Sequence, residues 1–321
     1  MSTTTLTTAR QISRHVVKSV LAIETPEGDG VTVRRSIGTS QLRNFTPFLM
    51  LDNFNVPPGG SFPDHPHRGM STVTLMLKGF FDHEDFAGHR GRIGPGDLQF
   101  MIAGKGIMHA EMPVHGKGLD DPYGLQLWID LPKQHKLVEP SYQELSASEI
   151  PSAHPTPNTL VKVICGESDG ENGEIVSSPV RPLGGCWYSD WIFNKKGEKG
   201  FQRIPKGWNS FIYTLSGQLI VGPSTPASHN VISPFHTVVL SNNTSSSEQE
   251  EEETGIYLES ASEEPVRFVV ISGEPLDQEI VQHGPFVMDS QKGILQAFKD
   301  FRDGKNGFEG AREWKSEIGK R

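Results

Sequence analysis

Two short histidine motifs, separated by several strand-like runs, constrain the fold of this chain more than any other feature. The first is His65-Pro66-His67 and the second is His109-Ala110-Glu111. Side chains at positions i and i+2 point to the same side of an extended strand, whereas a helix turns them to nearly opposite faces. Both motifs therefore favour β-strands. Pro66 lacks a backbone donor, so the first motif belongs at a strand start or a sheet edge.

The segment between the motifs has the pattern of strands joined by tight turns. Apolar, β-branched runs at 73–77 and 98–102 are separated by glycines and by Gly94-Pro95-Gly96. If neighbouring strands carry both motifs inward, three imidazoles and one carboxylate converge, which is a ligand set for a divalent transition metal. The predicted ligands are His65, His67, His109 and Glu111.

Two other groups of polar residues are candidates for the site. Asp82-His83-Glu84-Asp85 and His89-Arg90 flank a glycine. A polar hairpin end explains them, and metal ligation is the alternative. Farther along, the run 123–129 alternates, so Gln126 and Trp128 share one face of a strand. If that face lines the pocket, Gln126 could donate a hydrogen bond to a ligand; the alternative is ordinary packing of both side chains.

Length and charge limit the classes of protein. A chain of 321 residues suggests two domains, and its short apolar runs, punctuated by 34 glycines and 23 prolines, indicate mostly β structure. The net charge of −9 disfavours direct binding to nucleic acid or anionic lipid. We expect no membrane span, since no apolar run reaches the necessary length. Two cysteines without CxxC spacing suggest a reducing compartment, so we expect the cytoplasm.

An ordered set of motifs resembles the pirin family, a branch of the cupin superfamily. The motifs are residues 34–38, 47–49, 62–69, 83–86, 88–89, 95–99, 106–113, 124–128 and 283–288. The resemblance implies an all-β bicupin of two stacked antiparallel β-barrel, or jelly-roll, domains. It also implies one iron in the first barrel, at His65, His67, His109 and Glu111. The general cupin pattern has a glutamate where Ser71 and Thr72 stand here, so Glu111 must supply the carboxylate.

Pirins and related cupins resemble quercetin 2,3-dioxygenases, which implies an oxidoreductase. The expected substrates are a flavonol-like molecule and O₂, with carbon monoxide released, and the expected cofactor is one iron, as Fe²⁺ or Fe³⁺. Ligand type alone leaves manganese, zinc, nickel and copper open. Glu111 would be both a ligand and a candidate base for the flavonol hydroxyl.

The sequence leaves two alternatives to catalysis open. The family resemblance also implies a nuclear co-regulator, in which the oxidation state of the iron controls binding to transcription factors. On that reading the protein would be found in the nucleus as well as the cytoplasm. The other alternative is that the iron only stabilises the barrel.

The chain looks internally duplicated. Residues 204–217 can be laid without gaps on residues 66–79, so that Gly207 falls on Gly69 and Gly217 on Gly79. His65 and His67 then correspond to Arg203 and Pro205, which predicts a second barrel without metal and leaves His236 as a turn or packing residue. The predicted divisions are a metal-binding barrel at 1–137, a proline-rich linker at 138–158, a degenerate barrel at 159–288 and a helical tail at 289–321. The polar and acidic stretch 241–254 is expected to be a disordered loop.

Overall fold

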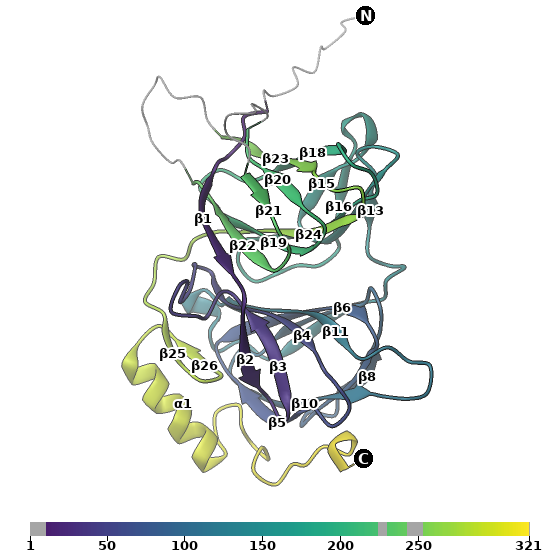
Figure 1. Ribbon diagram of the computed structural model, residues 1–321. Coiled ribbons are helices and arrows are strands. Elements are labelled where there is room, and N and C mark those ends of the chain that lie inside the picture. The colour runs from purple at the N-terminus through teal and green to yellow at the C-terminus, as the bar shows by residue number, and fades with distance from the viewer. Residues whose placement is uncertain (1–10, 224–229, 243–252, 321) are drawn as a thin grey trace, which may run out of the picture. The chain divides into compact units, whose positions relative to one another are not determined.

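The computed structural model describes residues 11–223, 230–242 and 253–320 (Figure 1). Within these residues the backbone is mostly strands and turns, and an α-helix lies near the C-terminus. The strands fall into two compact units. We call the unit of residues 20–151, 178–186 and 273 onward the first barrel, and the unit of residues up to 19, 152–177 and 187–272 the second barrel. The predicted all-β class with two cupin domains is confirmed.

Two antiparallel sheets enclose the core of the first barrel. In order of pairing, the larger sheet contains β12 (Ser141–Leu145), β9 (Leu98–Ile102), β6 (Met70–Lys78), β11 (Tyr123–Asp130), β4 (Phe48–Asn55), β3 (Val31–Arg35) and β2 (Ile23–Glu27). The smaller sheet contains β5 (Phe62–His67), β10 (Ile107–Val114), β7 (Phe80–Asp85) and β8 (Arg90–Ile93). Buried side chains from both sheets, such as Phe54 and Met76 facing Phe81 and Ile93, form one apolar cluster between them.

The second barrel repeats this plan. Its larger sheet contains β1 (Val16–Leu21), β22 (His236–Leu240), β19 (Asn209–Ser216), β24 (Val266–Gly273), β17 (Cys186–Phe193), β14 (Thr159–Cys165) and β13 (Ser152–Ala153). Its smaller sheet contains β18 (Lys199–Arg203), β23 (Gly255–Ser260), β20 (Leu219–Val221) and β21 (Asn230–Ile232). Trp191, Phe193 and Phe268 are fully buried in a core that again draws on both sheets.

The backbone supports the duplication seen in the sequence. The order β5-β10-β7-β8 in the first barrel matches β18-β23-β20-β21 in the second, position by position. The turns match as well: Gly69 and Gly207 both have φ 76°, and Gly79 and Gly217 have φ 63° and 69°. Glycine adopts these left-handed conformations without steric cost. The same backbone path is therefore specified twice.

The domain boundaries differ from the contiguous divisions expected from the sequence. β1 opens the chain yet joins the sheet of the second barrel, and the residues from 273 onward belong with the first. The predicted linker, residues 138–158, contains β12, which pairs with β9 of the first barrel, and β13. A short strand with alternating exposure gives a weak local signal, and its partner is chosen by contacts far away in the sequence.

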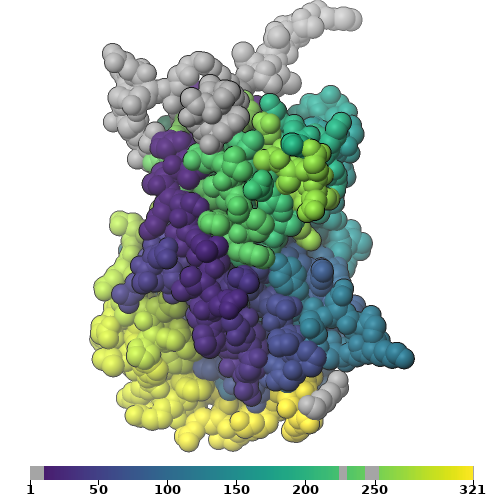
Figure 2. Space-filling view, in the orientation of Figure 1, coloured from purple at the N-terminus to yellow at the C-terminus, as the bar shows by residue number. Residues whose placement is uncertain are grey.

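The C-terminal segment forms the predicted helix and covers part of the first barrel. α1 (Gln291–Asp303) begins after Ser290, whose hydroxyl accepts a hydrogen bond from the backbone of Gly293, and ends at left-handed Gly304. Its buried face packs with Met108 of β10 and with Phe286. In Figure 2 the yellow atoms of this segment lie against the blue atoms of the first barrel. Apolar burial rather than helix propensity holds the segment in place.

Several smaller elements complete the described structure. They are β15 (Glu167–Asp169) paired with β16 (Ile175–Ser177), β25 (Val281–His283) paired with β26 (Phe286–Met288), and the 3₁₀ turns η1 (Lys133–His135), η2 (Glu171–Gly173) and η4 (Ile318–Lys320). Most of the predicted acidic loop, residues 243–252, lies outside the described residues. No helix among the residues described is both long and apolar enough to cross a membrane.

Candidate metal centre

β5 and β10 bring the two histidine motifs together. β5 is the edge strand of its sheet, as Pro66 predicted, and it pairs antiparallel with β10 so that His65 lies opposite His109. Directly opposite residues share one face of a sheet, and so do residues two apart on one strand. His65, His67 and His109 therefore face the same side. The ring of His67 lies 5.1 Å from the ring of Trp128 on the opposing sheet, so this face is the inner one.

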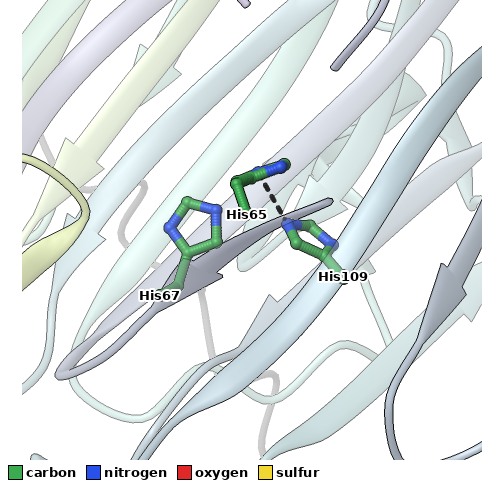
Figure 3. Close-up of side chains that lie close together, drawn as sticks. All are labelled: His65, His67 and His109. Carbon is green, nitrogen blue, oxygen red and sulfur yellow. Dashed lines mark hydrogen bonds between the residues drawn. The ribbon is translucent and has the colours of Figure 1, made fainter. Parts of the chain in front are cut away.

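The three imidazoles gather around one point (Figure 3). One ring nitrogen from each of His65, His67 and His109 lies within 4.8 Å of the other two, and the Nε2 atoms of His65 and His109 are 3.0 Å apart. Bonds of about 2.1 Å to a single ion such as Zn²⁺ place neighbouring ligand atoms about 3.0–3.4 Å apart. Small movements of the rings would bring all three nitrogens to that separation.

The surroundings favour the ligand form of these side chains. Burial lowers the pKa of His67 and His109 well below the ordinary histidine value, and the neighbouring His65 lowers both further. A neutral imidazole has a lone pair for a metal, whereas a protonated one has none. The Nδ1 atom of His67 is buried without a hydrogen-bond partner among the described residues. These residues fit a resident metal ion.

Glu111 lies on the same strand but outside the tight imidazole group. The register of β10 against β5 shifts between His109 and Glu111, so that Glu111 lies opposite Phe62. The extra residue of this bulge lies in β5, and β10 pairs with β7 without a shift, so Glu111 keeps the face of His109. The carboxylate is buried, with 4% exposure, and lines the same cavity as His65 and His67. Glu111 is therefore available as a fourth ligand.

Gln126 and Trp128 line the cavity, and their polar groups contact each other and Glu111. The Nε2 atom of Gln126 donates to both carboxylate oxygens of Glu111 at 3.3 and 3.2 Å. The indole Nε1 of Trp128 donates to Oε1 of Gln126 at 3.0 Å. This chain fixes the orientation of the Glu111 carboxylate. The predicted alternation of β11 is correct, but the Gln126 amide is directed at a ligand residue of the protein.

The turn that follows His67 is held by buried charges that the sequence analysis did not single out. Arg68 is 2% exposed, and its Nη1 donates to Asp300 at 2.8 Å. Lys136, also buried, pairs with Asp130 and donates to the carbonyl of Gly69 at 2.9 Å. Arg68 and Asp300 lie far apart along the chain, as do Lys136 and Gly69, so no local pattern signals these contacts. They fix the end of the strand that carries His65 and His67.

A cavity of about 640 Å³ opens beside the imidazoles. Its walls combine aromatic side chains with many polar and charged ones. Its volume is in the range of small-molecule sites. Arg35 and Asp52 form a bidentate ion pair at the wall, with distances of 2.7 Å from Nε and 2.6 Å from Nη2. The aromatic lining residues are Phe54, Phe62, Phe81 and Trp128. The cavity can accommodate a flat aromatic ligand next to the metal-ligating groups.

The architecture and the site define a class of protein. Two jelly-roll barrels, the first of which holds an inward-facing histidine cluster at paired strands, make this chain a bicupin. The sequence model described as Pirin matches residues 30–129, and the model described as Pirin C-terminal cupin domain matches residues 190–307. The chain belongs to the pirin family, as the motifs predicted.

Individual relatives agree with this assignment. The chain is 47% identical to Pirin of Mus musculus, over 96% of this chain and 99% of the mouse protein. It is 46% identical to Pirin of Homo sapiens, with the same coverage. A solved structure of quercetin 2,3-dioxygenase from Acinetobacter baumannii superimposes with a TM-score of 0.79 at 27% identity, covering 92% of this chain and 99% of the bacterial one.

Proposed function

We propose that this protein is a metal-dependent oxygenase that opens the ring of flavonols such as quercetin. The observation that carries the proposal is the cluster of three inward imidazoles, with a buried carboxylate nearby, beside a cavity that has aromatic and polar walls. The likeness to a quercetin 2,3-dioxygenase supports the substrate class. The reaction adds both atoms of O₂ to the flavonol and releases carbon monoxide.

We propose iron as the resident metal, with His65, His67, His109 and Glu111 as its ligands. Three neutral imidazoles and one carboxylate suit Fe²⁺, and they would leave two positions of an octahedron for small molecules. When bound, the iron would supply a Lewis acid and a one-electron redox centre. The ligand set by itself also accepts manganese, nickel, zinc and copper.

The side chains of the cavity would contact the substrate, accept its proton and orient the proton acceptor. Phe54, Phe62 and Trp128 offer flat apolar surface to the aromatic rings of the substrate and exclude water. Glu111 lies where it can accept the proton of the flavonol hydroxyl, because its carboxylate faces the cavity. Gln126 holds that carboxylate in one orientation through two hydrogen bonds. Trp128 in turn fixes the Gln126 amide, so that Nε2 rather than Oε1 faces Glu111.

The test is an aerobic assay of iron-loaded protein with quercetin under ¹⁸O₂. We expect loss of the flavonol absorbance, release of carbon monoxide, and two ¹⁸O atoms in the ring-opened product by mass spectrometry. Metal-free protein is the control for uncatalysed oxidation, and Glu111→Gln tests the proposed base. Turnover that is equal with and without metal, or a product without two ¹⁸O atoms, would contradict the proposal. The co-regulator role, transcription-factor partners and nuclear location stay predictions from the family resemblance.

A further inference from the structure

A second group of ligand-type side chains lies in the first barrel and shares no residue with the first. His83 lies on β7, His89 precedes β8, and Glu144 lies on β12. One potential ligand atom from each lies within 4.8 Å of the other two. The sequence placed His83 and His89 at a polar hairpin end and gave no sign that Glu144 would join them. The fold brings the hairpin of β7 and β8 next to β12, which lies much later in the chain.

The donor atoms of this group are poorly satisfied by the protein itself. His83 is 3% exposed, and its Nε2 atom lies 3.0 Å from Oε1 of Glu144, which is an ion-pair distance. The Nδ1 atom of His89 is buried with no hydrogen-bond partner in the described part of the chain. Buried polar atoms are normally paired, so an unpaired His89 nitrogen close to a second imidazole and a carboxylate points to a missing cation.

Neighbouring residues hold each member of the group in place. Gly91 lies opposite His83, and a Cβ atom at Gly91 would come within 2.6 Å of the His83 Nε2 atom, so glycine leaves room for the ring. The ring of His89 stacks on Tyr142 at 4.2 Å with an interplanar angle of 10°.

Hydrogen bonds hold two members of this group, His89 and Glu144, in place. Asp85 accepts from the backbone nitrogens of Ala87 and His89, both at 2.9 Å, which fixes the loop that carries His89. Gln99, itself buried, donates to Oε1 of Glu144 at 2.8 Å. Outer partners of this kind orient ligands in metal sites, so the group has the support that a metal site needs.

We propose that His83, His89 and Glu144 bind a second divalent transition-metal ion, separate from the centre at His65, His67 and His109. Two imidazoles and one carboxylate are a common zinc ligand set, which leaves one position of a tetrahedron for water. The side chain of Glu144 is 32% exposed, so an ion can reach the group from solvent. His83 is also the cross-strand neighbour of Glu111. The adjacent strands β7 and β10 would therefore each supply ligands to one of the two ions.

The test is zinc stoichiometry of the full-length protein. Chelator-treated protein is equilibrated with Zn²⁺, freed of unbound metal and analysed by mass spectrometry for zinc per chain. We expect about two zinc ions for the wild type and about one for His89→Gln and for Glu144→Gln. The matched controls His154→Gln and Glu139→Gln change an exposed histidine and an exposed carboxylate, and we expect them to keep two.

A variant of the first centre makes the test independent of whether the Glu144 variant folds. The double variant His65→Gln/His109→Gln keeps one imidazole of the first centre, and we expect it to retain one zinc ion. With Co²⁺ in place of Zn²⁺, that ion should give a visible d–d spectrum that disappears when Glu144→Gln is added. One zinc ion in the wild type, or none in the double variant, would show that the group is a polar network without metal.

Discussion

The first barrel carries histidines where the second barrel carries residues that are poor metal ligands. Arg203 and Pro205 stand at the positions of His65 and His67 in the overlay. On the neighbouring strand β23, Gly255 lies opposite Arg203, just as His109 lies opposite His65 on β10. The sheet order and the turn glycines are nevertheless the same in both. The comparison teaches that sheet pairing and turns specify this fold, and that the metal chemistry is added by a few side chains.

Replacing a ligand should separate the two barrels most strongly. We expect His65→Ala to lose its metal from the first centre and to reduce quercetin turnover by at least about 100-fold, because a neutral ligand to the ion is gone. Arg203→Ala, the corresponding change in the second barrel, should leave the metal content and the quercetin turnover unchanged. The measurements are iron content and turnover under identical loading. Equal loss in both variants would show that the overlay misplaces the chemistry.

Replacing the residue that follows the first histidine motif, and its counterpart in the second barrel, should give the next largest difference between the barrels. Arg68 and Lys206 correspond in the overlay, but Arg68 is buried against Asp300 while Lys206 is exposed. We expect Arg68→Met to lower the free energy of unfolding by about 3–5 kcal/mol, since it leaves a buried carboxylate without its partner. Lys206→Met should change it by no more than about 0.5 kcal/mol. Urea unfolding of metal-free protein measures both, and similar values would contradict the account.

Replacing Gly69, the turn glycine after the first histidine motif, should have the third largest effect. A Cβ atom at Gly69 would lie 1.9 Å from the carbonyl oxygen of Val287, and the residue also has φ 76°. We expect Gly69→Ala to cost about 2–4 kcal/mol, from the strain of a positive φ together with the clash. Gly59→Ala is the control, because φ there is 91° and nothing lies within 4 Å. It should cost about 1–2 kcal/mol. Thermal unfolding compares the two, and equal costs would rule out the clash.

Replacing Gln126, which orients Glu111, should have the smallest effect of the four changes. We expect Gln126→Leu to weaken metal binding about 10- to 100-fold without unfolding the protein, because Glu111 loses the donor that fixes its carboxylate. Gln134→Leu, on an exposed turn, is the control. Competition with a chelator of known affinity measures the change. An unchanged affinity for Gln126→Leu would mean that Glu111 does not ligate the ion.

Much of the first centre could be predicted from the sequence because its signal is local. His65 with His67, and His109 with Glu111, are spaced two apart, and the period of a strand alone places each pair on one face. Gly69 and Gly207 likewise revealed the duplication, since a left-handed turn leaves a glycine in the sequence.

Contacts between distant residues could not be predicted in this way. Glu144 reaches His83 only because β12 pairs with β9, and β12 lies within the predicted linker. Arg68 and Asp300 are buried partners that lie 232 positions apart in the sequence. β1 joins the second barrel, although it opens the chain, for the same reason. Residue type and spacing do not indicate such pairings, because packing in three dimensions decides them.

The most direct test of the central claim is an anomalous difference map from crystals of the iron-loaded protein, recorded at the iron edge. The account predicts a peak within about 2.0–2.3 Å of ring nitrogens of His65, His67 and His109 and of a carboxylate oxygen of Glu111. Its second prediction is that no such peak lies at Arg203 and Pro205. Iron-loaded crystals without a peak among the three imidazoles would contradict the account.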